Sequence, residues 1–316
     1  MSFDVRLTVI ALVTFLAAGA AVAAIVWVLA KRVRHIEPEA RARTLFRLRL
    51  LPVLAGLVAA LQGIVSFVIF EPRTEQEVFG RVLVGLALAA TALFAIGTVR
   101  LIRAAILTRR TFNGWIRNGT RIRLDGISVP SYAIDADFPI VAVVGLFQPQ
   151  LVIDRSVLAA CAPEELRAIF AHEQCHVERH DNLRRSLLTW LPDVLSLTGL
   201  GRALTAAWHE AAEGIADEAA GRLGPTGRLD LASALLRVAR LAPPLTQPIV
   251  LPASALYRGE DLADRVRRLL NPPAPLVRDS LAGWRRVTLT ASILVGGGLA
   301  LHAVHEVVET LAGLLP

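Results

Sequence analysis

The segment "AHEQCHVERHD", residues 171–181, contains three of the chain's seven histidines. Residues four apart on a helix share a face, so His172 and His176 can present two imidazoles to one metal ion. Glu173 follows the first histidine, and its carboxylate can take a proton from the attacking water. This H-E-x-x-H pattern is typical of zinc metallopeptidases, and the alternative is a solvated helix face with ordinary histidines. We predict that His172 and His176 bind Zn2+ and that Glu173 is the general base.

The third metal ligand must come from elsewhere in the chain. The class with H-E-x-x-H-x-x-G-x-x-H is excluded, because Arg179 and Asn182 occupy the positions of its glycine and last histidine. The other common solution is a carboxylate from a downstream helix, and "HEAAEGIADEAA" offers Glu210, Glu213 and Asp217. Glu213 and Asp217 are four apart, so one can bind zinc while the other accepts a hydrogen bond from a ligand imidazole. Glu210 is the rival ligand.

Other polar residues near the motif have more ordinary explanations. His180 follows His176 by one turn, but three histidines in a row along one helix cannot converge on a tetrahedral ion. We expect His180 to cap the helix or to contact an acidic group, and Asp181 to cap the helix or to support a metal ligand. No pattern identifies the group that stabilises the oxyanion, and His209 and Tyr257 are only guesses for it.

The composition indicates a membrane protein rather than two soluble domains. Hydrophobic residues make up 54% of the 316 residues and charged residues only 19%. Three apolar runs reach the length of about 20 residues that a membrane-spanning helix needs, at 7–30, 51–70 and 82–102. A fourth and shorter run covers 287–304. We therefore expect about four transmembrane helices.

Charged residues in the loops predict the orientation. The loop from Lys31 to Arg49 is strongly basic and should lie in the cytoplasm, which puts the N-terminus outside. The expected location is the cell inner (plasma) membrane, multi-pass, with the histidine cluster facing the cytoplasm. The expected partners are the lipid bilayer and a protein or peptide substrate, and a homodimer is an arrangement that the sequence allows. Topology explains the net charge of +7, so no direct binding of nucleic acid is expected.

The segment between the third and fourth runs has ordinary globular character. Strand-like runs occupy residues 120–154, and one long helix is predicted over 161–188. A second, alanine-rich helix is predicted over 203–223. The apolar patch 186–200 is too short and too broken by Pro192 to cross a bilayer, so it belongs to the core or lies on the membrane surface.

These elements predict an α+β fold in a multi-span α-helical membrane protein. Residues 1–110 would hold three transmembrane helices with the basic cytoplasmic loop, and 111–283 a cytoplasmic zincin-like metallopeptidase domain. Residues 284–316 would form the fourth transmembrane helix with a short external tail.

The order of these features resembles the membrane zinc metallopeptidases of the antibiotic-sensor transducer type (BlaR/MecR-like). The supporting segments are "EELRAIFAHEQCHVERHD", "EGIAD", "FPIVAVVGLFQPQLVID" and "DLADRVRRLLNPP". The resemblance implies a gluzincin domain in which the pattern E-x-x-x-D selects Glu213 as the zinc ligand and places Asp217 behind the ligands. By analogy, substrate would lie extended along the strand near 141–145. Those sensors carry an extracellular domain after the last span, and we expect this chain to lack it.

The implied function is a zinc metalloendopeptidase that cleaves a protein substrate in regulatory proteolysis and signal transduction, with a transcriptional repressor or the chain itself as substrate. One alternative is a membrane quality-control protease of the HtpX-like type, which shares the zinc motifs. Several such proteases carry membrane spans between the two motifs, whereas only 36 residues separate His176 from Glu213 here. The other alternative is a catalytically silent membrane scaffold, which would have no need for Glu173.

Overall fold

The computed structural model describes residues 2–30, 37–70, 79–242 and 262–271. The predicted fourth apolar run at 287–304 and Tyr257 therefore lie outside the described residues. Contacts divide the chain into two compact units. Of the described residues, unit 1 comprises 2–30, 37–70, 79–99 and 190–207, and unit 2 comprises 100–189, 208–242 and 262–271.

Unit 1 is built from three long helices. These are α1 (Phe3–Ala30), α2 (Pro38–Phe70) and the first part of α3 (Arg81–Asn118), and all three are long and apolar enough to cross a membrane. The pair α1 and α2 packs closely, since a Cβ atom added to Gly56 would lie only 2.7 Å from the Phe15 ring. Large apolar side chains along these helices are exposed, which suits lipid contact. The three predicted spans correspond to these helices.

The apolar patch around residue 190 packs inside unit 1. The Trp190 ring lies 6.4 Å from the Phe94 ring of α3, and Gly97 faces the Trp190 carbonyl. The short 3-10 helix η2 (Val194–Leu197) follows, and Asp193 before it forms a buried ion pair with Arg49 of α2. Of the two expected locations for this patch, the structure therefore selects the core.

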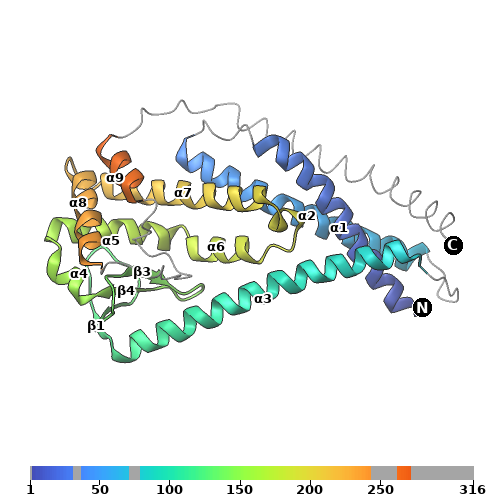
Figure 1. Ribbon diagram of the computed structural model, residues 1–316, viewed down its shortest axis with the longest axis horizontal. Helices are drawn as coiled ribbons and strands as arrows, with labels where there is room; N and C mark the ends of the chain where they lie inside the picture. Colours follow the sequence, from blue (N-terminus) through green and yellow to red (C-terminus); the bar gives the residue numbers. More distant parts are fainter. Residues whose placement is uncertain (1, 31–36, 71–78, 243–261, 272–316) are drawn as a thin grey trace. The chain divides into compact units, whose positions relative to one another are not determined.

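Unit 2 contains a four-stranded sheet (Figure 1). The strands are β1 (Thr120–Ile122), β2 (Ser131–Ile134), β3 (Val141–Val144) and β4 (Gln150–Asp154), in the order β1-β2-β4-β3. Strands β2 and β4 are parallel, whereas the other pairs are antiparallel. Among the strands that the structure describes, β3 pairs only with β4 and lies at the edge of the sheet.

Helices cover both faces of this small sheet (Figure 1). The strand residues Val143 and Ile153 pack on one face against Ile169 of α5 (Pro163–Glu178) and Leu235 of α8 (Gly227–Leu241). On the other face, the strand residues Ala142, Val144 and Val152 pack against Phe112 and Trp115 from the end of α3. The remaining helices are α4 (Arg155–Ala160), α6 (Asp181–Trp190), α7 (Gly199–Gly221) and α9 (Leu262–Leu270).

The prediction of a single helix over 161–188 is wrong. α4 ends at Ala160, α5 runs from Pro163 to Glu178, and α6 begins at Asp181. The chain breaks at His180, whose φ of 53° lies in the left-handed region that a helix cannot accommodate. The break reorients the chain so that the Asp181 carboxylate reaches back to His176. Helical periodicity could not reveal this turn, because no glycine or proline marks it.

Candidate metal centre

Helix α5 is anchored at its N-terminus by Glu165. One Glu165 oxygen accepts a hydrogen bond from the Ala162 N–H, and the carboxylate also pairs with Arg237 and Ser233 of α8. Burial of Ile169 and its neighbours then holds the helix on the sheet. These contacts determine how α5 presents its second half, which carries the metal-binding motif.

Three side chains converge at this second half of α5. Nε2 of His172 lies 3.2 Å from Nε2 of His176. The Glu213 carboxylate, from α7, lies 3.6 Å from Nε2 of His172 and 3.5 Å from Nε2 of His176. A tetrahedral zinc ion with bonds of about 2.0–2.1 Å separates its ligand atoms by about 3.3 Å. The three donors therefore fit such an ion, and all of their ligand atoms lie within 4.8 Å of one another.

A carboxylate supports each histidine from behind. Nδ1 of His172 lies 3.0 Å from Asp217, and Nδ1 of His176 lies 2.9 Å from Asp181. A carboxylate only accepts hydrogen bonds, so the contact with Asp181 places the ring hydrogen of His176 on Nδ1 and leaves its Nε2 to bind a cation. Asp217 lies at ion-pair distance from the corresponding atom of His172. Asp217 thus occupies the position that the family pattern implied, and Asp181 supports a ligand, one of the two roles expected for it.

Arg265 completes the charge balance, and the sequence analysis missed it. Its guanidinium, which is buried, donates to Asp217 at 2.6 Å and lies 3.2 Å from Glu213. The signal was present in α9, where Leu262, Val266 and Leu269 form an apolar stripe and Arg265 occupies the same face. An arginine on a buried face requires an acidic partner, although its identity could not be read from the helix alone.

The charges of this cluster shift the pKa values of its members. Burial lowers the pKa of His172, but its contacts with Asp217 and Glu213 outweigh burial and raise it to about 9. Burial opposes ionisation of Glu213, yet the two histidines and Arg265 hold its pKa well below the usual range. The raised pKa of His172 favours a protonated imidazole, and this proton would compete with a metal ion for the ring nitrogen.

Glu173 forms none of these ion pairs. Its side chain is buried, and no described residue gives a hydrogen bond to its Oε2 atom. Burial is the main reason why its pKa is raised, with a further contribution from Glu213. A buried carboxylate oxygen without a protein partner is suited to a water molecule or to substrate.

The remaining candidates lie outside the cluster. Glu210 is exposed and pairs with Arg268 at 3.3 Å, so it is not one of the converging donors. The exposed His180 side chain contacts the Glu178 carbonyl at the end of α5, in agreement with a capping role. His209 lies one turn before Glu213 on α7 and lines a pocket.

Comparison with known proteins finds one matching family. The model of Peptidase family M48 matches residues 131–254, which include α5 and the ligand-bearing part of α7. No curated protein matches the chain. Residues 131–254 are therefore similar to a family of zinc metallopeptidases, and the chain also has three helices that are long and apolar enough to cross a membrane.

Proposed function

We propose that the chain is an integral-membrane zinc metalloendopeptidase that hydrolyses peptide bonds of a protein substrate. The observation that carries this proposal is the convergence of His172, His176 and Glu213 beside the buried carboxylate of Glu173. A catalytically silent scaffold would have no use for Glu173, whose burial without a hydrogen-bond partner for Oε2 is unfavourable.

His172, His176 and Glu213 would hold the zinc ion. A bound zinc would act as a Lewis acid on the carbonyl group and make water more acidic. Glu173 accepts the proton of the attacking water while the new C–O bond forms, and then delivers it to the nitrogen as the C–N bond breaks. The raised pKa of Glu173 suits both steps, because the group must be able to hold the proton between them. Asp181 and Asp217 hold the two imidazole rings in a fixed orientation during both steps.

The edge strand β3 offers the backbone groups for an extended substrate. Among the described strands only β4 pairs with β3, and an extended substrate beside Val141 would gain main-chain hydrogen bonds. At the C-terminal end of β3, however, the Asn182 amide already donates to the carbonyls of Val143 and Gly145. We therefore propose that the substrate pairs with β3 near Val141 and contacts Asn182 at the C-terminal end of this strand.

The biological role proposed is regulatory proteolysis of a repressor or of the chain itself, as the resemblance to the antibiotic-sensor transducers implies. The basic loop between the first two helices supports a cytoplasmic peptidase and an external N-terminus in the plasma membrane. A neighbouring gene for a small winged-helix repressor would favour this role over membrane quality control.

Cleavage by the purified full-length protein tests the activity. The wild type, Glu173→Gln and the matched control Glu210→Gln are incubated with an unfolded protein substrate, with and without a chelator. We expect Glu173→Gln and chelation to abolish cleavage, and Glu210→Gln to resemble the wild type, because Glu210 lies on the surface. Bound zinc should be equal in all three proteins. Equal cleavage by the wild type and Glu173→Gln would refute the proposal.

A further inference from the structure

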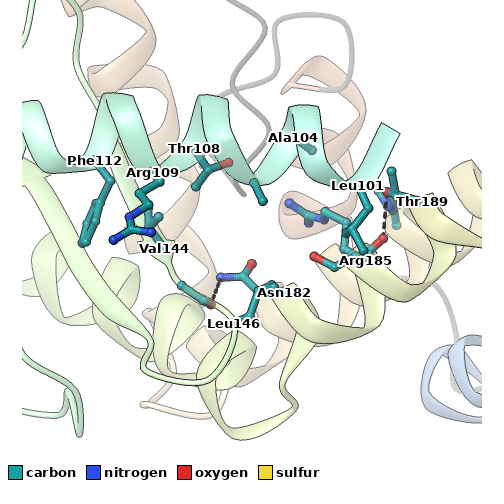
Figure 2. Close-up of a pocket in the computed structure, with 14 residues that line it drawn as sticks. Leu101, Ala104, Thr108, Arg109, Phe112, Val144, Leu146, Asn182, Arg185 and Thr189 are labelled. Atoms are coloured by element: carbon teal, nitrogen blue, oxygen red, sulfur yellow. Dashed lines mark hydrogen bonds between the residues drawn. The ribbon is translucent and has the colours of Figure 1, made fainter. Parts of the chain in front are cut away.

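A pocket of about 480 Å³ lies in unit 2 and is lined by α3, the end of β3 and α6 (Figure 2). One wall is a single, mostly apolar face of α3, with lining residues at helical spacing, Leu101, Ala104, Ala105, Thr108 and Phe112. The wall from α6 is polar and consists of Asn182, Arg185, Ser186 and Thr189. The pocket therefore joins an apolar wall to a polar wall, as a site for an amphiphilic molecule requires.

The wall from α3 continues the apolar surface of a helix that is long and apolar enough to cross a membrane. Residues 82–108 of this helix contain only two charged side chains, Arg100 and Arg103, and such arginines can extend toward the head groups. Large apolar side chains beside the pocket are exposed on the same stretch, Ile102, Ile106 and Leu107. Arg109 and Arg110 then end the apolar stretch. This pattern assigns the residues before Arg109 to the depth of acyl chains and the arginine pair to the level of the lipid head groups.

The pocket is also positively charged. Arg109 belongs to the α3 side and Arg185 to the α6 side (Figure 2), and the fourteen lining residues include no acidic one. The same sign continues along the chain, because residues 100–124 contain seven arginines and no aspartate or glutamate. A basic cluster next to a membrane-spanning helix attracts anionic lipids, and the donors of a guanidinium match the geometry of a phosphate group.

We propose that this pocket binds one anionic phospholipid from the surrounding membrane. One acyl chain lies against Ala104 and its apolar neighbours on α3, where burial of its CH₂ groups is favourable. Arg109 binds the phosphate group, and Arg185 and Ser186 offer donors to the ester carbonyl groups. The inference does not depend on the proposed peptidase activity, since it uses only the pocket and the adjoining apolar helix.

The charge of the pocket selects among possible occupants. A zwitterionic lipid would fill the apolar wall equally well, but its cationic group would face a site with two arginines and no carboxylate. Inorganic phosphate would satisfy Arg109 and gain nothing from the apolar wall. A peptide segment is the remaining class of occupant, and the position of the pocket beside the exposed apolar stretch of α3 favours a lipid over it.

Lipid binding to the full-length protein tests the proposal. The protein is delipidated in an uncharged detergent and titrated with phosphatidylglycerol or with phosphatidylcholine of the same acyl chains, and bound lipid is counted by native mass spectrometry. We expect one phosphatidylglycerol molecule per chain, bound about tenfold more tightly than phosphatidylcholine, as a single charge-assisted contact provides. An excess of inorganic phosphate should leave this lipid bound.

Substitutions on α3 distinguish the pocket from the rest of the helix. Ala104→Trp fills the apolar wall and should prevent binding, whereas the matched control Leu107→Trp should not, because Leu107 is exposed outside the pocket. Arg109→Gln should lower the affinity for phosphatidylglycerol about tenfold and leave that for phosphatidylcholine unchanged. Arg117→Gln is its matched control, since Arg117 is exposed on α3 and does not line the pocket.

Each alternative has a distinct outcome. Equal losses in Arg109→Gln and Arg117→Gln would show a diffuse attraction to the basic surface and would overturn the assignment. Displacement of the lipid by inorganic phosphate or by an unfolded protein substrate would also overturn it, in favour of an anion site or a peptide site. Ala105→Phe is a second filling variant in case Ala104→Trp does not fold, which the melting temperature reports. Retention of the lipid by the folded filling variants would place it elsewhere on the protein.

Discussion

Nη2 of Arg265 lies 2.6 Å from Oδ1 of Asp217, in a buried pair that joins α9 to the helix that carries Glu213. Arg265 thus pairs with two carboxylates, the buried Asp217 and the partly exposed Glu213. The pair neutralises charge behind the metal ligands, and a metal ion would add to it from the opposite side.

Removing this guanidinium should destabilise the metal-free protein. Arg265→Ala leaves the buried Asp217 carboxylate without this guanidinium, and such a loss costs about 3–5 kcal/mol. Added zinc should restore part of the stability, because it binds only the folded state. Thermal unfolding followed by tryptophan fluorescence measures both effects. Arg267→Ala, which removes an exposed ion pair on the same helix, should change stability by less than about 0.5 kcal/mol. Similar losses in the two variants would contradict the assignment.

Zinc affinity should weaken as the pH falls. The pKa of His172 is raised to about 9, so below that pH the imidazole carries a proton that a metal ion must displace. Each unit of pH below about 9 should therefore reduce the apparent affinity about tenfold, or about 100-fold between pH 8 and pH 6. Competition with a chelating dye over this range measures the slope. A flat profile between pH 6 and 8 would show that the site binds no proton when empty.

Asp181 should matter for metal binding although it is not a ligand. Asp181→Ala removes the acceptor that orients His176, and the loss of such a partner lowers metal affinity by about 10- to 100-fold. Asp135→Ala provides the control, since Asp135 is an exposed aspartate with only a surface ion pair. Zinc titration of both variants decides the point, and equal affinities would rule out an orienting role for Asp181.

The buried pair between Arg49 and Asp193 should stabilise unit 1. Arg49→Met leaves the Asp193 carboxylate buried without its cation and should lower the stability by about 3–5 kcal/mol. Arg43→Met on the same helix removes an exposed pair with Glu39 and should have an effect of less than about 1 kcal/mol. The melting temperatures of the two variants in detergent test the contrast. No difference between them would mean that the buried pair contributes no net stability.

Much of the metal centre could be predicted because its residues are close in sequence. His172, Glu173 and His176 lie within one and a half turns of one helix, so their relative positions follow from helical geometry alone. The same rule paired Glu213 with Asp217. The strand-like runs over 120–154 likewise indicated a sheet, but they did not show which strand would lie at its edge.

Helical periodicity alone could not decide whether Glu213 or Glu210 is the third metal ligand, because the two residues lie on neighbouring parts of the same helix. The packing of α7 beside α5 turns Glu213 toward the histidines and leaves Glu210 at the surface with Arg268. The sequence by itself therefore determined the chemistry within each helix, which is a local property of the chain. Only the tertiary structure decided the contacts between helices, including the turn at His180 and the approach of Arg265, because these depend on how distant segments pack.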